Sequence, residues 1–409
     1  GQTLWLLSMA LFIASFTMGG LNYIATILNC RAKGMGLMRM PLTVWTYFVS
    51  AILGVLSFPP LTAAAVMLLL DRHAGTSFFL PAGLVFGNQT LSHEGGTPLL
   101  FQHLFWFLGH PEVYVLVLPA LGIAFDVVST FARRPPFGYR VSVYALLVIA
   151  FLSMIVWGHH MYVTGMSPFV GEYFSIATVV ITAPFAVLGL NLIAGLWRGR
   201  LRLEVPMLFA LGIIATVGAG GFGGLYLATS ISDIYFHDSY FVVGHFHLMI
   251  GVVTMLGTFA AVYYWFPKLF GRAMNPTLGK VHFWLTFLPA IALFILMHYQ
   301  GMSGLLRRYS DHSIYEFAQV GRSLAQSISI LAYVAAGAQL LFFVNFFTSL
   351  WRGEQVGANP WEATTLDWAG PSPAPHGNYG EHAPVAHREP YDYDPSREAG
   401  RDFAPQGSA

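Results

Sequence analysis

The chain alternates between long apolar stretches and short polar connections. Each apolar stretch is about 20 residues or longer, the length that an α-helix needs to cross the roughly 30 Å hydrocarbon core of a bilayer. Backbone groups in lipid are satisfied only in helices and closed barrels, and stretches of this length favour helices. The pattern therefore predicts an all-α, polytopic transmembrane helical bundle with about nine spans, at 3–29, 43–70, 100–131, 139–164, 170–196, 205–230, 239–265, 280–302 and 323–351.

The basic residues predict how this bundle is oriented. They gather in the connections after the first, third, fifth and seventh spans, at 31–39, 133–140, 198–202 and 268–280. Basic connections face the cytoplasm, so the N-terminus is expected outside. Arg307 and Arg308 are the exception, because they lie on the outer side and suggest a local anionic partner.

After Arg352 the sequence changes character. Pro, Gly, His and acidic residues replace the apolar periodicity from 353 to 409. Such a composition predicts irregular structure rather than further spans. We therefore divide the chain into a transmembrane domain, 1–352, and a cytoplasmic tail, 353–409.

Composition agrees with a membrane protein. Of 409 residues, 56% are hydrophobic and only 10% are charged, whereas soluble domains carry about 25% charged residues. The net charge of +1 argues against a nucleic-acid partner. The single cysteine, Cys30, excludes an internal disulfide and a cysteine-based metal cage. Because the chain begins at Gly1 without a methionine, we expect a fragment or a processed chain.

Several spans contain polar side chains whose burial is costly. His110 and Tyr114 are four residues apart and share one helix face, while Glu112 points elsewhere. His159 and His160 lie near the outer end of the next span. Imidazoles suit copper, zinc, iron or nickel. The alternatives are a helix kinked at Pro111 and an interfacial histidine pair that binds nothing.

His245 and His247 present a different geometry. On a helix their side chains project about 200° apart, too far to share one ion, which indicates two separate centres. Haem iron is a natural occupant because one imidazole can hold it. The alternative is a pair of hydrogen-bonded core histidines.

Two further polar pairs lie at the outer side of the predicted bundle. His237 and Asp238, at its outer end, could bind a hard or borderline cation. Arg307 and Arg308 offer planar forks suited to carboxylates such as haem propionates. The alternative for the arginine pair is an ordinary solvated loop.

The motifs that contain these residues are highly specific. From about Leu4 to Tyr379 the chain resembles the catalytic subunit I of haem-copper oxygen reductases, of the cytochrome c oxidase type. The resemblance rests on H-L-F-W-F-L-G-H-P-E-V-Y, W-G-H-H-M-Y, H-D-S-Y-F-V-V-G-H-F-H and L-L-R-R-Y, together with T-I-L-N-C-R-A-K-G-M and N-P-W-E-A-T-T-L-D-W. It implies a proton-translocating oxidoreductase that reduces O2 to water, with electrons from cytochrome c.

The resemblance also implies roles for individual residues. Tyr114 would be cross-linked to His110 and would supply an electron and a proton, and Glu112 would pass protons onward. The remaining implied roles are copper binding by His110, His159 and His160; axial ligation of the high-spin haem by His245 and of the low-spin haem by His247; propionate binding by Arg307 and Arg308; magnesium binding by His237 and Asp238; and a proton path through Ser15, Asn22 and Glu112.

The implied cofactors are two haems of the haem A type, one copper ion and magnesium. The implied partners are subunit II, subunit III, cytochrome c, O2 and membrane lipid, with no nucleic acid. The implied location is the inner membrane of a bacterial cell.

Two departures from the family pattern stand out. The family fold has about twelve helices, and the spans here match the fourth onward, so the second axial histidine of the low-spin haem is not in this sequence. The usual proton-path lysine is replaced by Leu188, and polar neighbours by Phe125 and Phe185. Asp126, Thr182 and Asn191 are the polar residues left as substitutes.

Other functions compete with oxygen reduction. A quinol oxidase would take its electrons differently, which this chain does not decide. Nitric oxide reduction is favoured by the missing lysine but does not need the phenol of Tyr114. A multi-pass transporter without redox centres would leave the ligand-spaced histidines unexplained.

Overall fold

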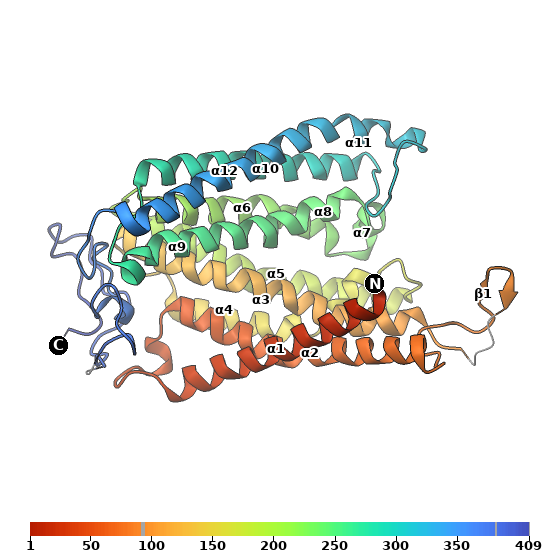
Figure 1. Cartoon of the computed structure of the whole chain (residues 1–409), viewed down its shortest axis with the longest axis horizontal. Coiled ribbons are helices and arrows are strands. Elements are labelled where there is room, and N and C mark those ends of the chain that lie inside the picture. Colours follow the sequence, from red (N-terminus) through yellow and green to blue (C-terminus); the bar gives the residue numbers. More distant parts are fainter. Residues whose placement is uncertain (91–94, 381–382, 409) are drawn as a thin grey trace.

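The computed structural model describes residues 1–90, 95–380 and 383–408, and it shows long helices packed side by side in one bundle (Figure 1). The long helices are α1 (Gln2–Asn29), α2 (Leu42–His73), α3 (Pro98–Ala132), α4 (Tyr139–Ser153), α5 (Pro168–Leu196), α6 (Val205–Leu227), α9 (Val253–Phe270), α10 (Pro276–Met302) and α12 (Ala325–Arg352).

Short elements connect them. These are the helices α7 (Ser230–Phe236), α8 (Tyr240–Phe246) and α11 (Gln319–Ser323), the short turns η1 (Leu37–Arg39), η2 (Trp157–Met161), η4 (Glu316–Ala318) and η5 (Leu366–Trp368), the π-helical segment η3 (His247–Val252), and a small antiparallel hairpin of β1 (Val85–Phe86) and β2 (Gln89–Thr90).

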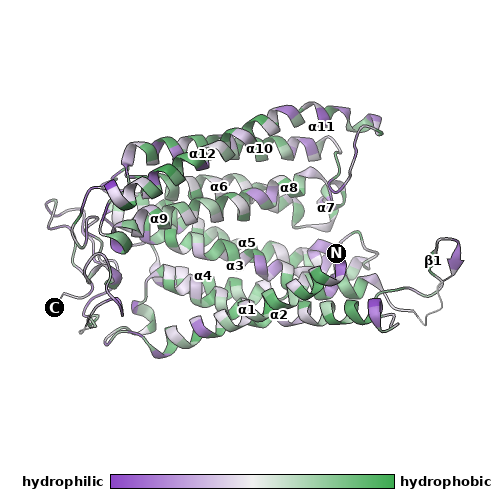
Figure 2. Ribbon diagram, in the orientation of Figure 1, coloured by the Kyte–Doolittle hydropathy of each residue, from purple (hydrophilic) through white to green (hydrophobic). Residues whose placement is uncertain are grey.

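The predicted all-α membrane bundle is confirmed. Among the described residues, eight helices are long and apolar enough to cross a membrane, counting Tyr240–Phe270 as one. Hydrophobic residues cover the middle of the bundle, and hydrophilic residues concentrate toward its two ends (Figure 2). This distribution is expected of helices whose flanks face lipid.

The span predicted at 139–164 differs from its expected form. Helix α4 has only 15 residues, and the chain then passes through a turn into η2. The amides of Met154 and Ile155 bond to carbonyls three residues back, at Phe151 and Leu152, which tightens the helix end. The second part of the predicted span is therefore a compact turn and not a continuous helix.

Helix α3 lies at the centre of the bundle, and its second half is buried from Leu118 to Ala132 apart from Pro119. Small residues let its neighbours approach closely. A Cβ added at Gly122 would lie 2.2 Å from the Thr46 hydroxyl of α2, and one at Gly257 would lie 2.6 Å from the Cβ of Ala120. Small residues of this kind allow close helix packing in membranes, and they fix α3 against both α2 and α9.

The described part of the tail beyond Arg352 forms only the short turn η5 and two isolated bridges, Arg272↔Gln355 and Tyr393↔Phe403. It nevertheless packs against one end of the bundle, opposite the β1–β2 hairpin (Figure 1). The side chain of Arg133, at the end of α3, is 0% exposed beneath it. Residues 381–382 and 409 of the predicted tail lie outside the described residues.

Candidate metal centre and its cavity

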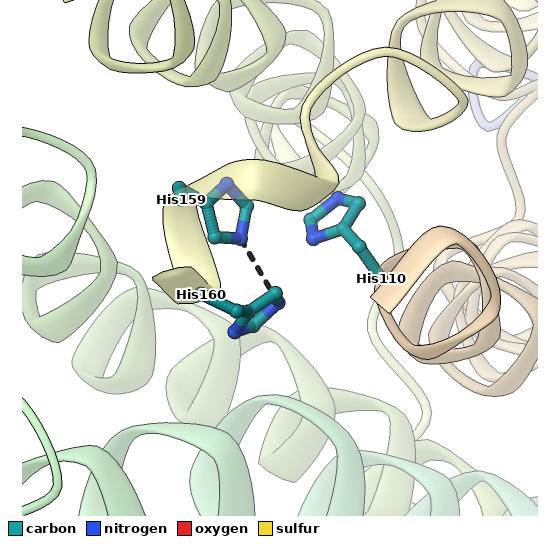
Figure 3. Close-up of side chains that lie close together, drawn as sticks. All are labelled: His110, His159 and His160. Atoms are coloured by element: carbon teal, nitrogen blue, oxygen red, sulfur yellow. Dashed lines mark hydrogen bonds between the residues drawn. The ribbon is translucent and has the colours of Figure 1, made fainter. Parts of the chain in front are cut away.

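Three of the predicted metal-ligating side chains meet in space. His110 comes from α3, whereas His159 and His160 come from η2, and one ring nitrogen from each lies within 4.8 Å of the others. Figure 3 shows the three rings gathered at one point, with His159 Nε2 3.0 Å from His160 Nε2. The irregular turn of η2 explains how two consecutive histidines can face the same place, which a straight helix would not allow.

A hydroxyl group fixes the orientation of His159. The Thr178 hydroxyl donates to the Phe174 carbonyl at 2.6 Å. It must therefore accept from Nδ1–H of His159, which lies 2.8 Å away. This bond makes Nε2 the unprotonated nitrogen of His159, which faces Nε2 of His160 here and would be the atom that ligates a metal. Such outer hydrogen bonds are the usual support of ligating histidines.

Aromatic packing holds the other members. The His160 ring stacks on Trp106, with 3.9 Å between ring centroids and 12° between planes. Gly158 makes room for the Phe174 ring, since a Cβ there would lie 2.2 Å from that ring. The turn that carries both histidines is thus seated against α5 by a position that only glycine can fill.

The buried environment of His110 fits a metal ion. Both of its ring nitrogens are buried, and neither has a hydrogen-bond partner among the described residues. Leaving a buried polar group unpaired costs about 1–3 kcal/mol. An ion bound by His110, His159 and His160 would satisfy that imidazole, and three imidazoles suit a copper or similar ion.

The cluster opens on a cavity of about 430 Å³ that His245 also lines. Nδ1–H of His245 donates to the Gly220 carbonyl at 2.9 Å, which leaves Nε2 as the free nitrogen. Glycines make room beside this ring, since a Cβ at Gly224 would lie 2.9 Å from it. His245 is therefore placed, oriented and given space to hold a group in the cavity.

Tyr114 lines the same cavity and makes an edge contact with His110, with 4.8 Å between ring centroids. Phe185 of α5 packs on its other side at 6.2 Å. The phenol thus lies next to the three-histidine cluster, with an apolar ring where the family pattern has a polar residue.

His247 is directed away from His245. Its Nδ1–H donates to the Val243 carbonyl at 2.9 Å, and its ring stacks on Phe294 of α10 at 4.7 Å. His245 in contrast contacts α6 through Gly220. Neighbouring histidines on one continuous segment therefore face different helices, and η3 begins at His247. Single-turn π segments of this kind occur frequently at functional sites.

The outer pair of arginines has an anionic partner within the chain. Arg307 donates to the Asp238 carboxylate from Nε at 2.9 Å and from Nη2 at 2.7 Å, and Arg308 donates from Nη1 at 3.3 Å. Burial opposes the charged form of Asp238, but the bonds from Arg307 outweigh it and lower the pKa of this carboxyl. Asp238 and Arg308 both have left-handed backbone, φ 52° and 70°, a strain typical of functional loops.

His237 joins this outer group through a residue that the sequence patterns did not single out. Its Nδ1 bonds to Asp233 at 2.8 Å, and its Nε2 lies 3.9 Å from Asp238. Both aspartates, His237 and Arg307 line the cavity beside the three histidines. The structure thus gathers the predicted magnesium pair and one of the two arginines at the same end of the cavity.

The predicted proton-path residues lie on two different helices. Glu112 is half-buried on α3, whereas Ser15 and Asn22 lie exposed on α1. Leu188 is fully buried at 0% exposure, so the position of the usual lysine is packed with apolar atoms. The polar residue Asn191 bonds to Ser142 at 2.9 Å.

Sequence reasoning missed Thr178, Trp106 and Asp233 as supports of the site. Thr178 and Asp233 are ordinary polar residues in sequence, and only the fold places them against histidines. A usable signal existed for the cavity wall: the glycine-rich run from Gly218 to Gly224 marks a helix face without side chains. We expected no particular role for it.

Comparison with known proteins agrees with this geometry. The sequence pattern of the family described as Cytochrome C and Quinol oxidase polypeptide I matches residues 1–339. The chain is 48% identical to the alternative cytochrome c oxidase subunit 1 of Bradyrhizobium diazoefficiens over 99% of the chain, and 40% identical to cytochrome c oxidase subunit 1 of Synechocystis over 96%. It is 42% identical to the probable cytochrome c oxidase subunit 1-beta of Nocardia farcinica over 93%.

These alignments span 69%, 68% and 62% of the relatives' own lengths, so the chain is shorter than each of them. A solved heme-copper terminal oxidase dimer shares the fold with a TM-score of 0.61 at 21% identity, over 77% of this chain and 57% of that one.

Fold and site together define a polytopic helical membrane protein with a cluster of three histidines that could hold a metal ion beside a cavity. The chain belongs to the subunit I family of cytochrome c and quinol oxidases, and it is an oxidoreductase of the cytochrome c oxidase type.

Proposed function

We propose that the chain is the catalytic subunit of a terminal respiratory oxidase that reduces O2 to water. The observation that carries this proposal is the convergence of His110, His159 and His160 with His245 around one cavity. The names of the relatives support it, because cytochrome c oxidases use O2 as their electron acceptor.

Histidines whose ring nitrogens are available for a metal indicate which residues would hold the cofactors. His110, His159 and His160 would bind copper, and His245 would be the axial ligand of the high-spin haem. Bound together, these metals supply the electrons for oxygen reduction. The chain itself confines the reaction in the cavity and presents Tyr114, whose phenol would donate a proton and an electron. Contact between the Tyr114 and His110 rings supports the proposed cross-link.

The remaining cofactor assignments rest on position. His247 has a free Nε2 and would ligate the low-spin haem. Arg307 and Arg308 would bind haem propionates after sharing or releasing Asp238. His237 and Asp238 would hold magnesium. We further propose haem of the A type at both haem sites.

Proton delivery and partners complete the proposal. Glu112 would relay protons to the site and to translocation, with Ser15 and Asn22 on the path that leads to it. The exposure of Ser15 and Asn22 on α1 fits a face that further protein covers. The partners would be subunit II, subunit III and cytochrome c, and the multi-pass chain would lie in a bacterial inner membrane.

A reduced-minus-oxidised optical spectrum of the purified complex, with and without carbon monoxide, tests the proposal. Two haems per catalytic subunit, one of them binding carbon monoxide, together with copper in the metal analysis, are the expected result. Non-haem iron in place of copper would indicate nitric oxide reduction, which the apolar Leu188 and Phe185 positions favour as the second candidate. A complex without haem would contradict both functions.

The electron donor requires a separate assay. Oxygen consumption with reduced cytochrome c and with a quinol, measured on the same complex, distinguishes a cytochrome c oxidase from a quinol oxidase. We expect turnover with cytochrome c.

A further inference from the structure

We propose that Asp126 and a row of hydroxyl groups on α2 form a proton-transfer line to Glu112, with Tyr391 of the C-terminal tail at its cytoplasmic mouth. This inference rests on the proposed function, because it supplies protons to an oxidase whose usual lysine position is the buried Leu188.

The hydroxyl row consists of Thr43, Thr46, Ser50 and Ser57. At about 100° per residue, these four positions fall within roughly 60° of one another on the surface of α2. Ser57 is 0% exposed and Ser50 is 5% exposed. The Oγ atoms of both serines are buried without a hydrogen-bond partner among the described residues. Buried hydroxyls are almost always paired, so two unpaired ones on the same face require a reason.

The row lies along α3. Gly122 of α3 contacts Thr46, since a Cβ there would lie 2.2 Å from the threonine Oγ1. One turn further along, the Tyr391 hydroxyl bridges the two helices, because it accepts from the Leu42 amide at 2.7 Å and donates to the Asp126 carboxylate. Helices α2 and α3 therefore run antiparallel, with the start of α2 level with Asp126.

This register places the two ends of the row. Both helices rise about 1.5 Å per residue, so Ser50 lies level with Leu118, and Ser57 lies level with Pro111, the residue before Glu112. Asp126 and Glu112 are 14 residues apart, which puts them within about 40° of the same side of α3. The row thus extends from the level of one carboxyl group to the level of the other.

The C-terminal tail covers Asp126, the carboxyl group at the start of the row. The Asp126 side chain is 3% exposed and Tyr391 is 5% exposed, so Asp126 is sealed from bulk solvent. The Tyr391 hydroxyl is hydrogen-bonded both to the Asp126 carboxylate and to the Leu42 amide. Protons would reach Asp126 through this phenol, at the end of the bundle that the basic connections assign to the cytoplasm.

The chemistry of the row suits proton transfer. A hydroxyl both donates and accepts hydrogen bonds. Each one can therefore take a proton from the side of Asp126 and release its own proton toward Glu112, ending unchanged. One proton leaves Asp126 and one arrives at Glu112. Ser50 and Ser57 are separated by about 10 Å along the helix, so ordered waters would bridge them.

The test uses the complete complex in liposomes, driven by an artificial reductant so that the natural donor does not matter. Oxygen consumption and protons taken up per electron are measured for Asp126→Asn, Tyr391→Phe, Ser50→Ala and Ser57→Ala. Ser50→Thr retains the hydroxyl. Thr216→Val is the matched control, because it removes a fully buried hydroxyl that bonds only to its own helix, at Gly212. Variants are compared at equal haem content.

We expect Asp126→Asn and the two alanine variants to slow turnover by about a hundredfold or more, as loss of a positioned proton donor does. Ser50→Thr and Thr216→Val should keep the turnover of the unaltered complex. If Asp126→Asn does not assemble, the contrast between Ser50→Ala and Ser50→Thr decides.

Unchanged turnover and unchanged proton uptake in Ser50→Ala and Ser57→Ala would overturn the line while leaving the oxidase function intact. An unaltered complex that holds haem but consumes no oxygen would overturn the proposed function and the line together. Equal slowing in Thr216→Val would also overturn the line, because the effect would then follow from any lost hydroxyl.

Discussion

Individual side chains prepare the three-histidine cluster before any ion binds. The Thr178 hydroxyl fixes the tautomer of His159 by accepting from Nδ1–H while donating to the Phe174 carbonyl. Trp106 stacks on His160 and restricts its ring to one plane. Each contact removes rotational freedom from a ligand, which lowers the entropic cost of binding a metal.

Replacing Thr178 by Val should weaken metal binding. His159 would lose the acceptor that holds its ligating nitrogen toward the cluster, and loss of such an outer contact costs about 10–100-fold in metal affinity. Copper per haem, measured by elemental analysis after mild chelation, reports the change. Thr258→Val is the control, since that hydroxyl bonds to its own helix at Thr254 and contacts no ligand.

Replacing Gly158 by Ala should displace η2. The added Cβ would lie 2.2 Å from the Phe174 ring, so the turn that carries His159 and His160 must shift. We expect reduced copper content, and partial recovery when Phe174→Ala is added because the ring is then gone. Copper content that is normal in the single variant would contradict this steric account.

At the scale of elements, a buried ion pair is among the contacts that fasten the tail to α3. Arg133 is 0% exposed and donates to Asp402, itself 1% exposed, at 2.6 Å. The guanidinium also bonds to the Glu362 carbonyl at 3.0 Å and lies 5.0 Å from the ring centres of Tyr393 and Phe403. One arginine at a helix end therefore gathers three separate parts of an otherwise irregular segment.

Asp402→Ala should release the tail. Removing one partner leaves Arg133 buried and uncompensated, at a cost of about 3–5 kcal/mol. Hydrogen exchange of residues 383–408, measured by mass spectrometry, should accelerate strongly. Asp394→Asn is the control, because Asp394 accepts only from its own turn and from Arg397. Slow exchange of the tail in Asp402→Ala would show that other contacts hold it.

The same ion pair predicts a pH dependence. The hydrogen bond from Arg133 is the main cause that lowers the pKa of Asp402 in the folded chain. A carboxyl with a lowered folded pKa stabilises the fold fully above its unfolded pKa of about 3.9. That contribution is lost as pH falls through the folded value. Tail exchange, corrected for intrinsic rates, should thus be constant from pH 7 to about 5 and rise below about 4.

At the scale of the whole molecule, the bundle has two different ends. The tail packs on one end, where Ala386 donates to the Lys33 carbonyl at 2.8 Å, and the β1–β2 hairpin extends from the other (Figure 1). The basic connections after α1, α3 and α9 lie at the tail end. The positive-inside rule predicts that this end faces the cytoplasm.

The single cysteine allows a direct check of this orientation. Cys30 is exposed at the end of α1, near the tail. A membrane-impermeant maleimide should label it in inverted vesicles and not in right-side-out vesicles. Gln89→Cys in a Cys30→Ser background, at the exposed hairpin, should show the reverse. Labelling of Cys30 from the outer side would invert the topology.

The class of fold could be predicted from the sequence alone, because crossing a bilayer demands about 20 apolar residues and satisfied backbone groups. Eight helices of the described residues meet that requirement. The sequence also predicted that His110, His159 and His160 belong together, and the structure brings them within 4.8 Å. The prediction rested on the motifs that contain these histidines. The spacing of 49 residues between His110 and His159 does not by itself indicate how far apart the two side chains lie.

Tertiary structure decided what local patterns cannot contain. The end of α4 at Ser153 depends on how η2 seats against Phe174, and hydropathy alone predicted a continuous span there. The anionic partner of Arg307 is Asp238, 69 residues away. The burial of Arg133 under Asp402 joins positions 269 apart. Such pairings form only when packing brings distant segments together. The sequence near a charged residue therefore does not show which distant residue will be its partner.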